Sequence, residues 1–374
     1  MPRSLYIHIP FCRKKFAYCD FYSIGYQNRL ARSFIDALSS RISRLDQDFS
    51  TIYIGGGTPS VLSLDNLKRL LMSLWPISRA VSEFTAEVNP ESVDKKRLKL
   101  FRDNGVNRIS IGVQSFSDQK LKSLGRVHSA KQAKQAICLA KESGIQNISI
   151  DLIFGLSGQT LADWKKELEC AVSLDVKHIS TYCLTYEKDT PLFLAVKRKF
   201  IVPLKDRVLA KMYGDAVSYL SGIGFLHYEI SNFAKPGFES KHNQNYWNGG
   251  SYLGLGPSAV SFDGATREKN VEDVERYILC LNKKKSPVIF RESLSKKRRA
   301  RELAAIKIRT KEGIDFDWFK KKTGFDFLAL AAGRIDNLKN SGLVKYQKKK
   351  GQNIDIRLTN KGFLFADSVS SELV

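Results

Sequence analysis

Short runs rich in β-branched and aromatic residues alternate with helical segments along the first half of the chain. Six strands are predicted from these runs: LYIHI (5–9), TIYIG (51–55), EFTAEV (83–88), RISIGV (108–113), ISIDLIF (148–154) and HISTYCL (178–184). Six successive units of strand followed by helix predict a parallel sheet with helices on its outside. Because six strands are too few for a closed eight-stranded barrel, the expected fold class is α/β, an open partial (β/α)6 barrel of the TIM type.

Several helix ends in this region carry capping signals. Helical periodicity is clear over 30–45. Ser129 precedes the helical stretch AKQAKQAICLAKES and Gly144 follows it, a pattern typical of an N-cap serine and a C′ glycine. Thr160 and Asp163 in TLADW form a second N-terminal capping signal. These signals indicate where the helices between the strands begin and end.

The last part of the chain has a different texture. From about Leu294 onward it is basic and rich in helical pattern, and it ends in GLVKYQKKKGQNIDIRLTNKGFLFADSV (342–369), which predicts strand, turn, strand and helix after two helices. We therefore expect a small winged-helix-like α+β domain over 294–374, after a barrel over 1–225 and a connecting segment over 226–293 that packs on it. Winged helices often bind DNA, but fold does not determine function, and a structural or docking role is an equal alternative.

The chain is strongly basic, with 61 Lys and Arg against 38 Asp and Glu and a formal net charge of +23. The positive charge is densest in four runs: KKK (283–285), KKRRAR (296–301), KKK (320–322) and KKK (348–350). Such charge attracts nucleic acid, anionic membrane or an acidic ligand. The alternative is a set of solvated lysine faces, and charge alone does not decide between them.

Two observations bear on the compartment. No run of about 18 apolar residues occurs, so no membrane-spanning helix is expected. The N-terminal sequence MPRSLYIHIPF lacks the long apolar region of a signal peptide. We therefore expect a cytoplasmic protein that is not integral to a membrane.

Chemically capable residues follow the predicted strands, at the edge where a parallel barrel places its active site. The glycines of IGGGTPS (54–60) allow close backbone approach to an anionic group, although they also suit a tight turn. Glu87, Gln114 and Asp151 stand near other strand ends and together suit a ligand with hydroxyl and amino groups. Arg126 in LGRVHS is suited to a carboxylate. Structural polar groups and a solvated arginine are the competing interpretations.

Two further segments suggest cofactor chemistry. HNQNYW places His242, Asn243, Tyr246 and Trp247 together, just before the glycine-rich YLGLG. Histidine is a common axial ligand of haem iron and aromatic side chains suit a flat macrocycle, but a single histidine is also often structural. In the N-terminal loop, Cys12 and Cys19 suggest an iron–sulfur site, which usually needs three or four thiolates.

The order of motifs resembles a known family. YIHIPFC…YCDF, IGGGTPS, EVNPES, ISIGVQSF, IDLIFGL and YEISNFAKPG…HNQNYW…YLGLG occur in the order found in radical S-adenosylmethionine (SAM) proteins similar to oxygen-independent coproporphyrinogen III oxidase, over nearly the whole chain. The HNxxYW motif, and Asp20 and Phe21 where the oxidase carries a further cysteine, resemble the haem-chaperone branch. The resemblance implies haem binding and delivery to haem-requiring client apoproteins, possibly ones at the membrane surface, without decarboxylation; the alternative is the decarboxylating oxidase. Nucleic-acid binding through the tail is the least favoured hypothesis.

The resemblance also implies which residues bind which cofactor. The SAM set comprises Tyr6, Gly56, Gly57, Thr58, Glu87, Gln114, Arg126 and Asp151, with backbone of Cys183–Leu184 near the adenine. The haem set comprises His242, Asn243, Tyr246 and Trp247. Family members hold a [4Fe–4S] cluster by a CxxxCxxC loop, and Cys12 and Cys19 match its first and third ligands. The middle ligand falls on Phe16, which has no ligating atom, so cluster binding is weakened or lost, Asp20 or His8 substitutes, or the residue is a sequence error.

Overall fold

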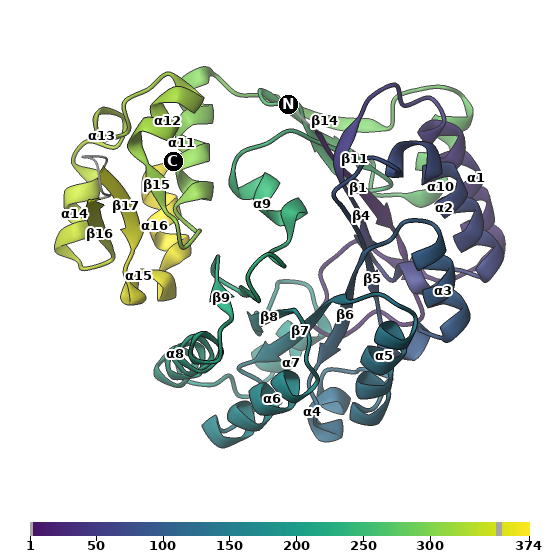
Figure 1. Ribbon diagram of the computed structural model, residues 1–374, viewed down its shortest axis with the longest axis horizontal. Helices are drawn as coiled ribbons and strands as arrows, with labels where there is room; N and C mark the ends of the chain where they lie inside the picture. The colour runs from purple at the N-terminus through teal and green to yellow at the C-terminus, as the bar shows by residue number, and fades with distance from the viewer. Residues whose placement is uncertain (1–2, 349–353) are drawn as a thin grey trace.

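The computed structural model describes residues 3–348 and 354–374, and its central feature is a large mixed sheet (Figure 1). Six neighbouring parallel strands form the middle of this sheet, in chain order: β1 (Arg3–Ile9), β4 (Phe49–Gly56), β5 (Glu83–Val88), β6 (Arg108–Gln114), β7 (Asn147–Phe154) and β8 (His178–Cys183). Each coincides with one of the six predicted strands, so the predicted partial α/β barrel is confirmed.

Helices cover the outside of these strands (Figure 1). They are α1 (Asn28–Ile42), α2 (Leu64–Ser78), α3 (Lys95–Asp103), α4 (Asp118–Ser123), α5 (Ala130–Glu142), α6 (Leu161–Ser173), α7 (Pro191–Lys197) and α8 (Asp206–Gly222). Both predicted capping signals are present: Ser129 forms a capping box with Gln132, and Thr160 forms one with Asp163. Gly144 follows α5 with φ +88°, a left-handed conformation that favours glycine.

The connecting segment extends the barrel sheet at both of its edges. At the β1 edge, β11 (Tyr252–Leu255) pairs in parallel with β1 and leads to antiparallel β12 (Val260–Phe262), β13 (Thr266–Asn270) and β14 (Val288–Ser293). At the other edge, β10 (Asn232–Ala234) pairs with β8, and β9 (Leu226–His227) pairs with β10. Strands from the predicted barrel (1–225) and from the predicted connecting segment (226–293) therefore belong to one sheet. The boundaries between the three predicted domains remain predictions.

The helix α9 (Lys241–Trp247) lies between the two edges (Figure 1). Its chain leaves β10 at one edge of the partial barrel and enters β11 at the other edge. The HNQNYW motif is thus carried on a short helix that bridges the open side of the barrel. A separate pair of two-residue strands, β2 (Phe11–Cys12) and β3 (Ile24–Gly25), frames the N-terminal cysteine loop.

The C-terminal region is a small α+β unit beside α9 (Figure 1). After α10 (Val274–Asn282), which packs on α1, it contains α11 (Lys296–Lys307), β15 (Ile314–Asp315), α12 (Phe316–Thr323), α13 (Phe327–Leu330), α14 (Arg334–Asn340), β16 (Val344–Lys348), β17 (Ile354–Leu358), α15 (Asn360–Leu364) and α16 (Ala366–Leu373). Four helices, rather than the predicted two, precede the hairpin, and β15 adds a third strand to it. The predicted turn, with most of the run at 348–350, lies outside the described residues.

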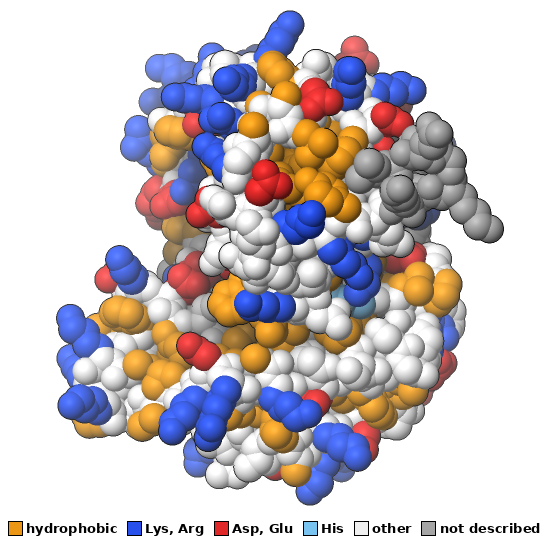
Figure 2. Space-filling view, turned by 90° about the vertical axis from the view of Figure 1, so that its left-hand side faces the viewer, with side chains coloured by type: hydrophobic (Ala, Val, Ile, Leu, Met, Phe, Trp, Pro, Cys, Tyr) orange, Lys and Arg blue, Asp and Glu red, His pale blue; other side chains and the backbone are white. Residues whose placement is uncertain are grey.

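The surface shows how the positive charge of the chain is distributed on one face of the molecule. Figure 2 shows Lys and Arg dispersed among acidic and apolar side chains over one whole face. Across the described ranges 3–348 and 354–374, no helix is both long enough and apolar enough to cross a membrane.

Candidate functional site

A cavity with a volume of about 870 Å³ lies between the mouth of the barrel, α9 and α11. This size is within the range of about 300–1,000 Å³ that is usual for small-molecule sites. Its walls are rich in aromatic side chains: Tyr6, Phe21, Tyr22, Tyr53, Tyr182, Tyr246, Trp247, Tyr252 and Phe262. Cationic side chains from the N-terminal loop, β13 and α11 also line it: Lys15, Arg267, Lys269 and Arg299. Four carboxyl groups lie among them: Asp20, Glu87, Glu272 and Glu302.

A buried carboxylate fastens the start of α9. Glu83, only 3% exposed, accepts hydrogen bonds from the backbone N–H groups of Lys241 and His242 at 2.9 and 3.0 Å. It also accepts from the hydroxyl of Ser240 at 3.3 Å, whose Oγ in turn accepts from the N–H of Asn243 as the N-cap. A negative charge at a helix N-terminus is favourable because it meets the free N–H groups there. The helix therefore has a fixed position in the open side of the barrel.

His242 is buried, and both of its ring nitrogens are hydrogen-bonded. Nδ1 lies 2.8 Å from Oγ1 of Thr51, and Nε2 lies 2.8 Å from the hydroxyl of Tyr246. Burial, with a smaller effect of the Arg108 guanidinium, lowers the pKa of His242 to about 3, so the ring is neutral near pH 7. The predicted haem ligand thus lines the cavity, but its ring has no free nitrogen in this conformation.

The rest of the motif faces the cavity and α11. Asn243, Tyr246 and Trp247 all line the cavity. The ring of Tyr246 meets that of Tyr252 edge to face at a centroid distance of 4.8 Å. Nε1 of Trp247 is buried and has no hydrogen-bond partner among residues 3–348 and 354–374. The motif therefore supplies an aromatic wall that includes one unsatisfied donor.

Two predicted carboxyl groups lie inside the barrel mouth. Glu87 accepts hydrogen bonds from the Tyr53 hydroxyl at 2.6 Å and from the Gly56 N–H at 3.2 Å. Burial raises the pKa of Glu87 to about 7, and the Asp151 charge nearby adds to this rise. Burial also raises the pKa of Asp151, whose carboxylate accepts a hydrogen bond from Ser110 at 3.4 Å. Perturbed carboxyl groups of this kind are typical of ligand sites.

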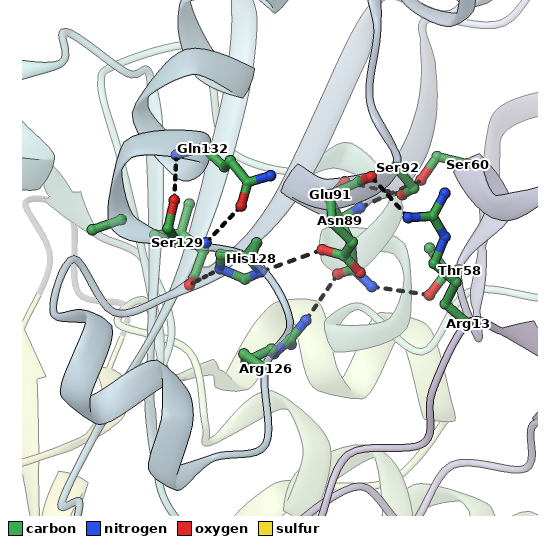
Figure 3. A network of polar contacts seen from close by, with 12 residues as sticks. Arg13, Thr58, Ser60, Asn89, Glu91, Ser92, Arg126, His128, Ser129 and Gln132 are labelled. Carbon is green, nitrogen blue, oxygen red and sulfur yellow. Dashed lines mark hydrogen bonds and ion pairs between the residues drawn. The ribbon is translucent and has the colours of Figure 1, made fainter.

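A polar chain connects Arg126 to the cysteine loop (Figure 3). Arg126 Nη1 donates to Oδ1 of Asn89 at 3.0 Å, and Asn89 Nδ2 donates to the Thr58 hydroxyl at 2.9 Å. The Thr58 hydroxyl donates to the thiol sulfur of Cys12 at 3.7 Å. Two of the predicted SAM-binding residues are therefore linked to a predicted iron ligand.

Phe16 fills the position of the middle cluster ligand. The centroid of its ring lies 3.8 Å from Cζ of Arg126. The ring also stacks on that of Tyr18, with an angle of 10° between the two ring planes. Arg126 also donates from Nε and Nη2 to the Tyr18 hydroxyl, at 3.0 and 2.6 Å. An aromatic ring and a guanidinium in this arrangement attract each other. The loop is thus packed around an aromatic side chain where a thiolate would be required.

The donor set of this loop does not fit a [4Fe–4S] cluster held by three thiolates. Cys12 and Cys19 supply two, and burial raises the pKa of the Cys19 thiol, which disfavours the thiolate. The predicted substitutes do not complete the set: His8 is hydrogen-bonded to Tyr6 and to the Tyr22 carbonyl, and Asp20 lines the cavity. Within residues 3–348 and 354–374 no group of three or more His, Cys, Asp or Glu could hold a metal ion.

The remaining predicted residues surround the strand ends. Tyr6 lines the cavity, and Gly56 has φ +101°, where a Cβ would lie 2.5 Å from the His8 ring. A Cβ on Gly57 would lie 2.5 Å from the Phe11 carbonyl oxygen. Gln114 is buried with φ +65°. Leu184, after Cys183, already donates its N–H to the Phe154 carbonyl at 2.8 Å.

Several cavity residues were missed by the sequence analysis. Tyr53 lies on a strand and belongs to no motif. Tyr252 is the first residue of YLGLG, but that segment was noted for its glycines and not for this tyrosine. Arg299 belongs to the basic run at 296–301, yet its guanidinium donates to the Gly249 carbonyl at 2.9 Å and is bonded to Glu302 at 2.6 Å. Only the alternation of inward-facing residues along β4 could have indicated Tyr53.

The fold and the strand-end residues together define a radical SAM protein. The profile of the radical SAM superfamily matches residues 6–171. The solved structure of coproporphyrinogen III oxidase (HemN) from Escherichia coli superimposes with a TM-score of 0.84 over 100% of this chain and 90% of that chain, at 23% identity, which bears on the fold alone.

Curated relatives are similar over nearly the whole length. "Heme chaperone HemW" of Bacillus subtilis (strain 168) is 36% identical over 98% of this chain and 98% of its own. HemW of Lactococcus lactis (strain IL1403) is 36% identical over 98% of this chain and 96% of its own, and that of Mycobacterium tuberculosis (strain H37Rv) is 32% identical over 100% and 95%. The chain belongs to the HemW family.

Proposed function

We propose that this protein is a haem chaperone, which binds haem in the cavity beside α9 and transfers it to haem-requiring apoproteins. The observation that carries the proposal is the cavity of about 870 Å³ with aromatic walls, one wall of which is the HNQNYW helix. The flat, apolar macrocycle of haem suits aromatic walls. Cationic groups at Lys15 and at Lys269, which is ion-paired with Glu272, suit the two propionates.

We infer that the strand-end residues hold S-adenosylmethionine, a molecule that supplies a reactive sulfonium when it is bound. The chemistry of the side chains supports this: Glu87 and Asp151 accept hydrogen bonds, and the guanidinium of Arg126 suits a carboxylate. The predicted cluster is not part of the proposal, since the loop offers two thiols and a phenylalanine. Decarboxylation of coproporphyrinogen, which depends on such a cluster, is accordingly not proposed.

The client is a haem-requiring apoprotein in the cytoplasm or at the inner face of a membrane. Haem bound in this cavity has to leave it toward the client. On the face shown in Figure 2 the basic side chains are interspersed with acidic and apolar ones, which does not favour a nucleic-acid surface on that face.

A titration with haem tests the proposal. The protein is expected to bind about one haem per chain and to give it up to an apo-haem protein at a rate above that of free exchange. Val260 lines the cavity, and Val260→Trp should fill part of it and weaken binding by at least about tenfold. Val127→Trp, at an exposed position, is the matched control and should bind haem normally. Equal affinities for both variants would show that haem binds elsewhere.

A further inference from the structure

The hydrogen bonds around His242 determine which of its nitrogens carries the proton. Thr51 donates its only hydroxyl proton to Oγ of Ser4 at 2.8 Å. The Thr51 oxygen must therefore accept from Nδ1–H of His242, which leaves the lone pair on Nε2. This is the tautomer in which a histidine binds a metal through Nε2 while its other nitrogen is fixed by a hydrogen bond.

The Tyr246 hydroxyl occupies the lone pair of Nε2. It donates to Nε2 at 2.8 Å, and the two rings stand at 89° with centroids 5.0 Å apart. The two residues are four apart on α9, so they lie on the same face of the helix. Tyr246 and His242 both line the cavity, whereas Thr51 does not.

We infer that Tyr246 is a latch, whose hydroxyl blocks the iron-binding nitrogen of His242 until haem enters the cavity and displaces it. Ser4 and Thr51 are positioning residues, which hold His242 in the tautomer that binds iron. This inference rests on the proposed function and adds the residue that opposes ligation.

Little else needs to move for the latch to open. The start of α9 is fastened by Glu83, and the ring of His242 is held by Thr51 on one side and lies 5.1 Å from the ring of Tyr53. Tyr246, by contrast, is half-buried and borders the cavity, and its ring packs edge to face on Tyr252, so displacement of its hydroxyl involves this one aromatic contact. A ligand nitrogen that is covered by an internal donor binds haem reversibly, and a chaperone needs this in order to release its cargo.

The test is a haem titration of Tyr246→Phe, followed by absorption and electron paramagnetic resonance spectra. Removal of one competing hydrogen bond should tighten binding about fivefold and speed association. The gain should vanish in the His242→Ala background, because there is no nitrogen left to uncover. Thr51→Val should weaken binding about 10- to 100-fold and shift the spectrum away from imidazole ligation, without changing the cavity wall.

Tyr213→Phe is the matched control, because it removes a tyrosine hydroxyl that lies 3.3 Å from Nε2 of another buried histidine, His227, and Tyr213 does not line the cavity; its haem affinity should match that of the unmodified protein. Thermal unfolding of each variant shows whether it is folded. If His242→Ala does not fold, the affinities of Thr51→Val and Tyr246→Phe still test the latch. Haem affinity of Tyr246→Phe that is unchanged or lower would overturn the latch. So would haem affinity and spectra that are the same in Thr51→Val and His242→Ala as in the unmodified protein. Either result would leave haem binding itself intact. Absence of haem binding by the unmodified protein would instead overturn the proposed function.

Discussion

Phe16 shows how one side chain alters a site whose other parts are present. Its ring packs against Arg126 and Tyr18, and Arg126 is joined through Asn89 to Thr58. Phe16→Cys should therefore do two things, because it adds a third thiol to the loop and removes the ring under the guanidinium. After anaerobic reconstitution we expect the unmodified protein to hold little iron, and the variant to hold about four iron and four sulfide per chain.

The matched control is Phe200→Cys, which also replaces a phenylalanine by cysteine, at an exposed position outside the loop. It should behave like the unmodified protein in iron and sulfide analysis. About four iron atoms in the unmodified protein would contradict the assignment, since a third ligand would then have to exist.

Most of the site residues could be predicted from motifs, but their partners could not. Cys12, Glu87 and His242 are visible in the sequence because each stands in a recognisable context. The roles of Thr51 and Ser4 depend on a hydrogen bond between β1 and β4, and nothing in their local sequence indicates it. Arg299 could not be predicted for another reason: a run of cations is usually solvated, and here a hydrogen bond to Gly249, just after α9, and a contact with the Phe262 ring hold Arg299 at the cavity.

At the scale of the element, α9 depends on Glu83 more than on its own sequence. Seven residues are too few for a helix that is stable alone. Glu83→Gln should lower the free energy of unfolding by about 2–4 kcal/mol, because it replaces a charged acceptor of three hydrogen bonds by a neutral amide. Haem affinity should fall as well, because α9 forms a wall of the cavity.

Urea unfolding measures the stability effect. Glu142→Gln is the control, because Glu142 makes an exposed ion pair with Lys95, and its loss should change the free energy of unfolding by less than about 0.5 kcal/mol. A similar small change for Glu83→Gln would mean that α9 is held by its side chains rather than by its N-terminus.

The central strands and their helices were predictable because each is long, periodic and bounded by capping or glycine signals. The six strands β9–β14 were not predicted. This holds even for β11, whose residues lie within the glycine-rich YLGLG noted in the sequence. Several of these strands are only two to four residues long, and their pairing depends on residues far away in the sequence, such as Tyr252 with Phe262 and with Ser4. The α+β character of the C-terminal region was predicted, but the two additional helices before the hairpin were not.

At the scale of the whole molecule, buried histidines and buried carboxyl groups have opposite effects on acid stability. Burial lowers the pKa of His227 to about 4 from an ordinary value of 6.5. Its contribution to stability is present above pH 6.5 and is lost as the pH falls toward 4, because only the unfolded chain takes up the proton. Burial raises the pKa of Glu229 to about 7, so its contribution is present below pH 4.5 and is lost as the pH rises toward 7.

Single variants separate the two contributions. Relative to the unmodified protein, His227→Phe should gain about 1.4 kcal/mol of unfolding free energy per pH unit as the pH falls from 6.5 to 4. Glu229→Gln should gain by a similar amount per unit as the pH rises from 4.5 to 7. Urea unfolding at half-unit steps of pH measures both slopes, and parallel profiles for variant and unmodified protein would contradict these pKa shifts.

The pairing of β1 with β11 also affects the order in which the chain can be completed on the ribosome. Leu5 pairs with Leu253, so one edge of this apolar strand has no partner until about 250 further residues have been added. At about 5–20 residues per second this lasts roughly 10–50 s. During that interval β1 presents an unpaired strand edge to other nascent chains, and a protein that carries cargo for others would itself need protection while it is being made.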